Sequence, residues 1–396
     1  MTRPNRTRWI ARGAALAAAL SLPAAAATDT TVFGDPARGR ALFETKQCVR
    51  CHAVWGHGGK VGPDIVRAVA GKSVPELAGA FWNHTPRMIS EMQTQGHPWP
   101  SLERDEMGDL LSYLYYLRLF DAPGDAVQGA ISFGRLGCSA CHDVGGDQGA
   151  IGGSLDRFSR YASSVPLAQA MWNAAPRMQA TQLGRGRPIP TFTGTEVADI
   201  QAYLREEGSR GGERTVLLPL PDPHRGQKLF RSKGCAKCHE GAGAVIDLAD
   251  AALHRSVSEI AGVLWNHSYA MRDRMRESGI PFPRFSGNEM ADVISYVYFK
   301  GFLGQHGDPK RGGRVFRDRG CAGCHTGEDA IGPDLGRAPV DDPVALASAM
   351  WNHAPEMHEL MGQQGVPWPK FEEGEMEDLV SYLQALQRRR RASVGR

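Results

Sequence analysis

The sequence predicts an all-α protein built from four tandem helical units. Three observations predict it: one cysteine motif occurs four times, a glycine and a phenylalanine precede each copy at fixed distances, and each copy closes with a helical run of the same pattern. The repeat length of about 85 to 95 residues lies within the usual size range of small domains. The 47 glycines and 25 prolines indicate many loops between the helices.

Each motif has the form Cys-x-x-Cys-His, and the four copies use all eight cysteines. Two thiols three positions apart can each add to a vinyl group of haem, and the adjacent histidine is then held beside the iron as its proximal ligand. The sequence therefore predicts four covalently attached haems c. The attachment cysteines are Cys48, Cys51, Cys138, Cys141, Cys235, Cys238, Cys321 and Cys324. The proximal iron ligands are His52, His142, His239 and His325.

Two other cysteine chemistries compete with haem attachment. Zinc also binds Cys-x-x-Cys pairs, but its sites need a second ligand pair at a regular distance, and here each pair stands alone with its own histidine. A thioredoxin-type redox motif requires a βαβ setting, for which the sequence has no signal. Haem attachment is the interpretation that fits the spacing.

The repeat extends well beyond the cysteines. The glycine nine residues before each motif is Gly39, Gly129, Gly226 or Gly312, and the phenylalanine four residues later is Phe43, Phe133, Phe230 or Phe316. The closing run repeats two acids and a tyrosine: Glu106, Asp109, Tyr113; Glu196, Asp199, Tyr203; Glu289, Asp292, Tyr296; and Glu375, Asp378, Tyr382. We expect the glycine to allow close approach of the first and last helices, and the two aromatic rings to fill their crossing.

The coarse structure of a unit is illustrated by the first one. Apolar spacing predicts helices over residues 35–47 and 103–120, and two further helices over 74–83 and 86–95, divided before Pro86. The connectors between units one and two and between units three and four are short, whereas residues 208–225 are long and proline-rich. This pattern predicts two di-haem halves, units one and two and units three and four.

On these residues, and on the turns Gly62-Pro63-Asp64 and Gly332-Pro333-Asp334, the units resemble class I cytochromes c. Tandem pairs of units resemble di-haem cytochromes c built from two such domains. The resemblance covers essentially the whole mature chain and implies four helical domains, each wrapped round a haem, with the Gly-Pro turn supporting the proximal histidine through a backbone carbonyl. Units two and three depart from it, with Gly152-Gly153 and Val245-Ile246-Asp247 at this place.

The distal iron ligand must come from the segment after a repeated Trp-Asn pair. A methionine stands six residues after each tryptophan, and His and Met ligation suits electron transfer, so the predicted distal ligands are Met88, Met178, Met271 and Met357. Two other sets are each incomplete in unit two. A second methionine gives Met92, Met275 and Met361, with Gln182 in unit two; a histidine after the asparagine gives His84, His267 and His353, with Ala174 in unit two. We expect these histidines, with the asparagines and tryptophans, to line the haem edge and to hydrogen-bond propionates or the methionine environment.

The N-terminus predicts export. Four arginines precede a short apolar core and a small-residue cleavage site, which is typical of a cleaved signal peptide, or otherwise of an uncleaved anchor. Export would place the protein in the periplasm, where haem is attached to such motifs. The predicted division is residues 1–27 signal peptide, 28–122, 123–212, 213–304 and 305–387 cytochrome c domains one to four, and 388–396 a basic tail.

Charge limits the partners. The net charge of +3 falls to about −1 without the signal peptide and to about −6 without the five tail arginines, so an acidic body argues against nucleic acid. A run of arginines at a chain end is usually solvated and disordered, but this tail is also a candidate for peripheral association with a membrane or a complex.

The sequence favours a periplasmic electron carrier that exchanges single electrons with redox partner proteins, rather than an enzyme. Two alternatives remain open. One is a peroxidase-like or other small-molecule haem oxidoreductase with an open iron site in unit two, and the other is an electron-transfer subunit of a larger oxidoreductase.

Overall fold

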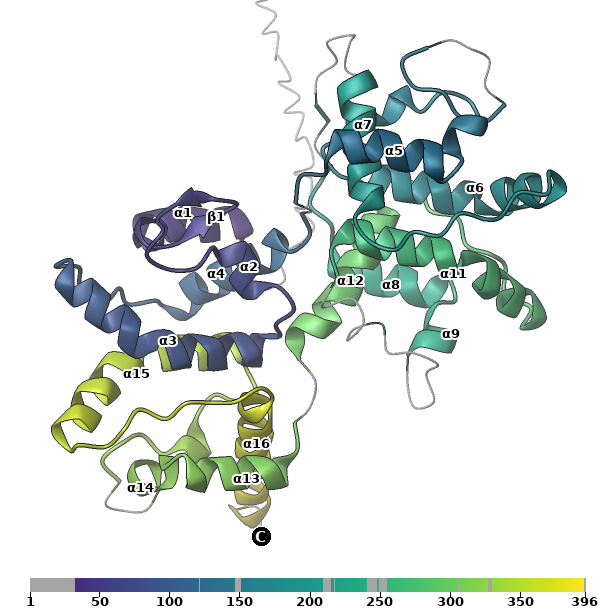
Figure 1. Ribbon diagram of the computed structural model, residues 1–396. Coiled ribbons are helices and arrows are strands. Elements are labelled where there is room, and N and C mark those ends of the chain that lie inside the picture. Colours follow the sequence, from purple (N-terminus) through teal and green to yellow (C-terminus); the bar gives the residue numbers. More distant parts are fainter. Residues whose placement is uncertain are drawn as a thin grey trace, which may run out of the picture.

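The structure, a computed structural model, describes residues 33–120, 122–146, 151–208, 215–216, 218–240, 248, 255–304, 307–326 and 330–394. The predicted signal peptide lies outside these ranges. The described ranges are mostly helical, and the sheet found in them is a short antiparallel pair, β1 (Ala53–Val54) and β2 (His57–Gly58). The all-α prediction is confirmed, and the helices are arranged in two lobes (Figure 1).

Each unit contains the same three long helices. The first helix is α1 (Pro36–Thr45), α5 (Ala126–Arg135), α8 (Pro223–Ser232) or α13 (Pro309–Asp318). The middle helix is α3 (Val74–Thr94), α6 (Val165–Gly184), α11 (Val257–Glu277) or α15 (Pro343–Gln363). The closing helix is α4 (Arg104–Leu117), α7 (Glu196–Gly208), α12 (Glu289–Leu303) or α16 (Glu375–Val394).

Shorter helices lie between the first and middle helices. Those at the cysteine motifs are η1 (Cys48–Arg50), η2 (Cys138–Ala140), α9 (Ala236–His239) and α14 (Cys321–His325). Those that follow the motifs are α2 (Ile65–Val69), η3 (Asp156–Phe158) and η5 (Leu335–Arg337).

The first and closing helices cross at the repeated glycine, as the sequence predicts. A Cβ atom on Gly39 would overlap the Asp109 carbonyl oxygen of α4, so only glycine allows this approach. The rings of Phe43 and Tyr113 lie beside the crossing with centroids 6.0 Å apart. The same overlap would arise at Gly129, Gly226 and Gly312.

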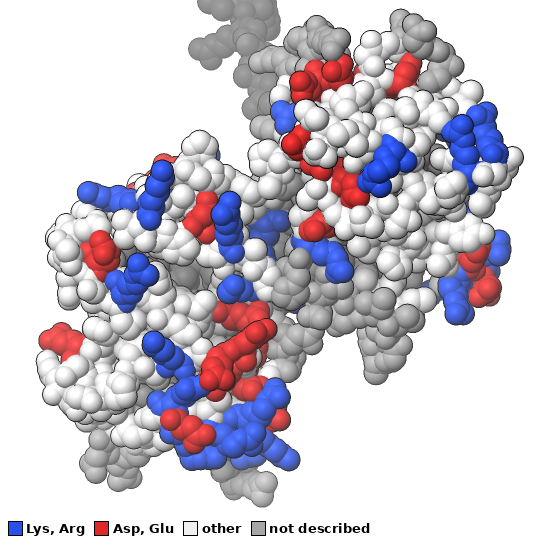
Figure 2. All heavy atoms as spheres, in the orientation of Figure 1, with Lys and Arg blue, Asp and Glu red and all other residues white. Residues whose placement is uncertain are grey.

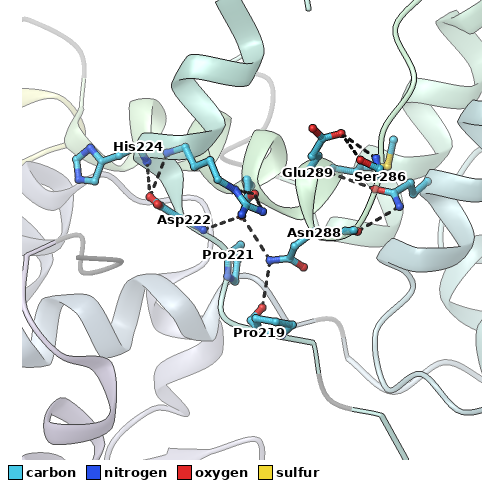
Figure 3. Close-up of polar contacts among 12 residues, drawn as sticks. Pro219, Pro221, Asp222, His224, Ser286, Asn288 and Glu289 are labelled. Atoms are coloured by element: carbon cyan, nitrogen blue, oxygen red, sulfur yellow. Dashed lines mark hydrogen bonds and ion pairs between the residues drawn. The ribbon is translucent and has the colours of Figure 1, made fainter. Parts of the chain in front are cut away.

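The second acidic residue of each closing helix, Asp109 in unit one, stabilises the crossing of the first and closing helices. Asp109 is buried and accepts the backbone N–H of Asp35 at 2.6 Å and the Arg38 guanidinium at 2.8 Å. In unit three Asp292 likewise accepts the backbone N–H of Asp222 at 2.9 Å and the Arg225 guanidinium. Asp222 itself caps α8, and Asn288 donates to the Pro219 carbonyl at 3.3 Å (Figure 3). A buried carboxylate with several donors stabilises the fold, because each of its acceptor sites is satisfied.

The middle helix is continuous, and the predicted break before Pro86 is wrong. Helix α3 runs through Pro86 as a single helix. Proline cannot donate a hydrogen bond to the carbonyl four residues earlier, which belongs to Trp82. Trp368 of unit four donates its indole N–H to that carbonyl at 3.0 Å, and in α15, which contains Pro355, the Trp351 carbonyl accepts the indole N–H of Trp99 at 3.2 Å. A neighbouring unit therefore replaces the bond that the proline removes.

The units pair differently from the expected halves. Helix α15 of unit four packs on α3 and α4 of unit one, and α11 of unit three packs on α6 and α7 of unit two. Figure 1 shows α3 beside α15 in one lobe and α6 beside α11 in the other. Units one and four form one lobe and units two and three form the other, so the halves expected from connector length are wrong.

The Trp-Asn pair holds each lobe together. The Asn352 side chain accepts the Leu102 N–H at 3.0 Å and donates to the Leu102 carbonyl at 2.7 Å, and Trp351 donates to the Pro100 carbonyl at 2.6 Å. The equivalent asparagine bonds join Asn83 to Phe371, Asn173 to Phe285 and Asn266 to Phe192. The indole N–H groups of Trp172, Trp265 and Trp351 likewise bond the partner unit, whereas the buried indole N–H of Trp82 has no partner among the described residues. Propionate binding by these side chains stays a prediction.

The lobes meet through units one and three. Tyr115 of α4 is fully buried and donates its hydroxyl to the Ser295 carbonyl of α12 at 2.6 Å, and Tyr116 donates to the Pro221 carbonyl at 3.0 Å. Phe33 and Phe302 pack beside this contact with centroids 5.9 Å apart. The spatial order of the units is therefore four, one, three, two.

Replacing Asn352 with alanine tests the pairing. The change leaves the Leu102 N–H without its partner, while the Leu102 carbonyl keeps the Ser348 hydroxyl at 2.8 Å, so we expect a loss of about 1–3 kcal/mol in the stability of the one–four lobe. Hydrogen exchange should rise at Leu102 in unit one. Asn173→Ala is the matched control and should raise exchange at Phe285 in the other lobe. Unchanged exchange at both positions in their respective variants would contradict the pairing.

Candidate metal centres

Each cysteine motif forms one tight helical turn. In unit one the backbone N–H of His52 bonds the Cys48 carbonyl at 2.9 Å, which places both cysteines and the histidine on a single turn. The residue before the first cysteine is left-handed in every unit, as Gln47, Gly137, Gly234 and Gly320. This residue ends the first helix and turns the chain into the motif.

An ion pair ties the motif to the closing helix. Lys46 bonds Glu106 at 2.8 Å, and its counterparts are Arg135 with Glu196 at 3.2 Å, Lys233 with Glu289 at 3.1 Å and Arg319 with Glu375 at 2.8 Å. The hydrogen bond from Lys46 lowers the pKa of Glu106. The basic partner was missed in the sequence, although a lysine or arginine stands two or three positions before every motif.

The cysteines are neither paired nor activated. No disulfide joins any of the eight. Burial raises the pKa of the first cysteine of each motif, Cys48, Cys138, Cys235 and Cys321, to about 11. A redox-active thiol needs a lowered pKa, so this environment disfavours the thioredoxin interpretation. The described residues also contain no cluster of three or more His, Cys, Asp or Glu side chains of the kind that zinc requires.

The proximal histidines are oriented by a backbone carbonyl. His52 Nδ1 lies 2.9 Å from the Pro63 oxygen, and His325 Nδ1 lies 2.8 Å from the Pro333 oxygen. Donation from Nδ1 leaves Nε2 free to bind a metal and fixes the ring orientation. Gly62 and Gly332 lie against the two imidazoles, where a Cβ atom would collide with the ring.

Unit two keeps this arrangement although its turn departs from the pattern. His142 Nδ1 lies 3.0 Å from the Gly153 oxygen, and Gly152 touches the ring. A glycine carbonyl therefore substitutes for the proline carbonyl. In unit three the buried Nδ1 of His239 has no partner among the described residues, and Val245-Ile246-Asp247 lies outside them.

Unit two encloses a cavity of about 420 Å³. Cys138, Cys141 and His142 line it on one side, and the middle helix α6 lines it with Ala174, Met178, Gln182 and others. The remaining walls are largely apolar, including Phe133, Leu155, Phe158, Leu167, Phe192, Val197 and Ile200. An apolar slot between a histidine and a methionine, with two thiols at its edge, fits a covalent haem.

The three candidate distal positions lie on one helix face. Because α6 is continuous, Ala174, Met178 and Gln182 follow each other at one-turn intervals, and all three line the cavity. Their counterparts in α3 are His84, Met88 and Met92. The continuous helix therefore places the histidine on the methionine face, which the sequence could not establish across Pro86.

The histidines at this position differ among the units. The rings of His84 and His52 have centroids 6.2 Å apart, and those of His353 and His325 are 6.0 Å apart. Burial, followed by the neighbouring imidazole, lowers the pKa of both His84 and His353. His267 of unit three is exposed, and its Nδ1 lies 2.9 Å from the Val263 oxygen of its own helix.

The methionines predicted as distal ligands also have different surroundings. Met178 lines the cavity opposite His142, and Met271 packs against the core of the two–three lobe. Met88 and Met357 are half-buried, one turn after His84 and His353.

These features define a class: small helical domains with a haem-attachment turn and a carbonyl-bound proximal histidine. The family model of cytochrome c matches residues 36–118 and 309–387, which are nearly the whole of units one and four, so these two units are similar to cytochrome c. No curated protein and no solved structure matches the chain. Cytochrome c domains carry covalent haem c and exchange electrons with redox partners, and the two matches support this role for units one and four.

Replacing Gly152 with alanine tests the proximal geometry. The new Cβ atom would collide with the His142 ring, so we expect the second haem to lose its normal low-spin spectrum or fail to attach. The matched control is Gly134→Ala in α5, where nothing lies within 4 Å and alanine should be neutral or slightly stabilising. The haem-to-protein ratio and the paramagnetic resonance spectrum measure the effect. A normal second haem in Gly152→Ala would refute the role of this glycine.

Proposed function

We propose that the protein is an exported tetrahaem cytochrome c that passes single electrons between redox proteins. The observation that carries the proposal is the repeated turn, in which two cysteines and a histidine share one helical turn in all four units. When bound, each haem would supply a one-electron couple. The protein itself holds the proximal imidazoles of units one, two and four through Nδ1. In unit two the apolar walls of the cavity would keep water from the iron.

We propose that Cys48, Cys51, Cys138, Cys141, Cys235, Cys238, Cys321 and Cys324 attach the haems and that His52, His142, His239 and His325 bind the irons. On the distal side, Met178 and Met271 are the proposed ligands of the second and third haems. In units one and four, Met88 and Met357 compete with a histidine of the same helix face.

The proposed location is the periplasm. The basic and apolar N-terminal residues and the need to attach haem outside the cytoplasm support it. Within the described residues, none of the helices combines the length and hydropathy needed to cross a bilayer.

The C-terminal arginines were expected to form a disordered tail, but the structure places residues 388–391 in a helix. Helix α16 continues through them to Val394, and Arg390 bonds Asp334 at 2.7 Å, next to the proline whose carbonyl holds His325. Arg388 and Arg389 are exposed, and Figure 2 shows basic groups gathered near the end of the one–four lobe. We propose that these exposed arginines attract an acidic redox partner or an anionic membrane surface.

An open haem enzyme is the competing function, and it concerns unit two. Alanine and glutamine there replace the histidine and second methionine of the other units. Met178 lines the cavity and can still close the distal side. Carbon monoxide binding by the reduced wild-type protein would favour the enzyme, whereas its exclusion favours an electron carrier.

Mass spectrometry of the mature protein tests the haem count. We expect four haems that survive acid and organic solvent, on a chain that begins near Thr28. Cys235→Ser/Cys238→Ser should remove one haem mass and leave three. Three or fewer haems in fully matured wild-type protein would overturn the tetrahaem proposal.

Charge-neutral variants test the arginines. Arg388→Gln/Arg389→Gln should leave the haem spectra unchanged but slow association with an acidic partner at low ionic strength, because steering acts on the encounter rate and fades with salt. Arg390→Gln is the comparison, since it breaks the bond to Asp334 and should also disturb the fourth haem. Equal association rates for the double variant and wild type across a salt series would remove the docking role.

A further inference from the structure

We propose that the four haems are of two kinds, with His84 and His353 as distal iron ligands in units one and four and methionine as the distal ligand in units two and three. The inference rests on the tetrahaem function proposed above. It replaces Met88 and Met357 as the ligands of the first and fourth haems.

The spacing of the paired rings carries the inference. Two imidazoles that bind one metal from opposite sides are separated by two metal–nitrogen bonds of about 2 Å each, plus a little over 1 Å from each nitrogen to its ring centre, or about 6 Å between centroids. His52 and His84 are 6.2 Å apart, and His325 and His353 are 6.0 Å apart. The two units thus hold the same spacing independently, at the distance that bis-histidine ligation requires.

The helix face supplies a second observation. In unit two the residue equivalent to these histidines is Ala174, and it lines the cavity together with Met178. This helical position therefore points toward the haem. With alanine in that place, unit two has no imidazole to offer, and Met178 is the ligand that its α6 face presents.

In unit four, the surroundings of the His353 ring also leave one nitrogen available for a metal. His353 Nδ1 lies 3.8 Å from a carboxylate oxygen of Glu356, on the same helix one turn later. Nε2 is therefore the nitrogen left for a metal. An outer carboxylate near the other ring nitrogen is a common arrangement around metal-bound histidine.

Unit three has the histidine but uses it differently. His267 is exposed, and its Nδ1 lies 2.9 Å from the Val263 carbonyl of α11. Its neighbour Met271 is packed against the core of the two–three lobe. The presence of a histidine in the sequence therefore does not by itself decide the ligand, and the third haem is assigned to methionine.

The two kinds of haem coincide with the two lobes. Units one and four share one lobe and units two and three share the other. Methionine raises the potential of a haem relative to a second histidine. Electrons would therefore enter at the one–four lobe and move downhill to the two–three lobe through the contact of α4 with α12.

Near-infrared magnetic circular dichroism and electron paramagnetic resonance of the full-length oxidised protein test the assignment. We expect equal amounts of bis-histidine and His/Met signals in the wild type, and reduction in two separate steps of two haems each. His84→Ala and His353→Ala should each lose half of the bis-histidine signal and bind carbon monoxide at one reduced haem. Met88→Ala, Met357→Ala and His267→Ala are the matched controls and should keep the wild-type signals.

The alanine variants could fail to fold for lack of a distal ligand. His84→Met and His353→Met avoid this problem, because each replaces a histidine ligand with a methionine that can also bind iron. Each should convert one bis-histidine signal into a His/Met signal and raise the potential of that haem, with four haems still present by mass. Four His/Met signals in the wild type, or loss of a signal in Met88→Ala and Met357→Ala, would overturn the inference while leaving the tetrahaem function intact. A haem count below four would instead overturn the function itself.

Discussion

One constraint governs the molecule: the middle helix of each unit must present one face to a haem and another to a neighbouring unit. In α3 the residues that point toward the haem are one turn apart, starting at His84, while the adjacent Trp82 and Asn83 bond unit four. The residues of both faces keep a fixed position relative to each other only because the helix continues through Pro86. The indole of Trp368 supplies the hydrogen bond that the proline cannot, so the pairing of units and the distal haem wall depend on the same backbone.

Much of the fold follows from local patterns in the sequence. The glycine and phenylalanine of the first helix and the tyrosine of the closing helix predict a crossing that the structure contains, because close approach needs glycine and helical spacing brings the aromatic rings together. The continuous middle helix was not predictable, since the donor that compensates for Pro86 lies 286 positions from the Trp82 carbonyl that it bonds. The interface role of the asparagines was hidden for the same reason, although a Pro-x-Leu or Pro-x-Phe segment precedes every closing helix and was a readable signal for their partners.

Connector length misled the prediction of halves because closing a longer loop costs little free energy. Each doubling of a loop adds only about 0.6 kcal/mol, whereas an asparagine that bonds both backbone groups of a partner contributes more than that. Side-chain hydrogen bonds therefore choose the partner unit. The result is a spatial order of units, four, one, three, two, that differs from their order in the chain. The distal ligands that we propose follow this spatial order, with histidine in the one–four lobe and methionine in the two–three lobe.

An experimental structure of the haem-loaded protein, at a resolution that shows the axial ligands, tests this account most directly. The account predicts α3 packed against α15 and α6 against α11, with His84 and His353 bound to the irons of units one and four and Met178 bound to that of unit two. A structure in which unit one packs on unit two through their middle helices, or in which Met88 and Met357 occupy the distal positions, would contradict it.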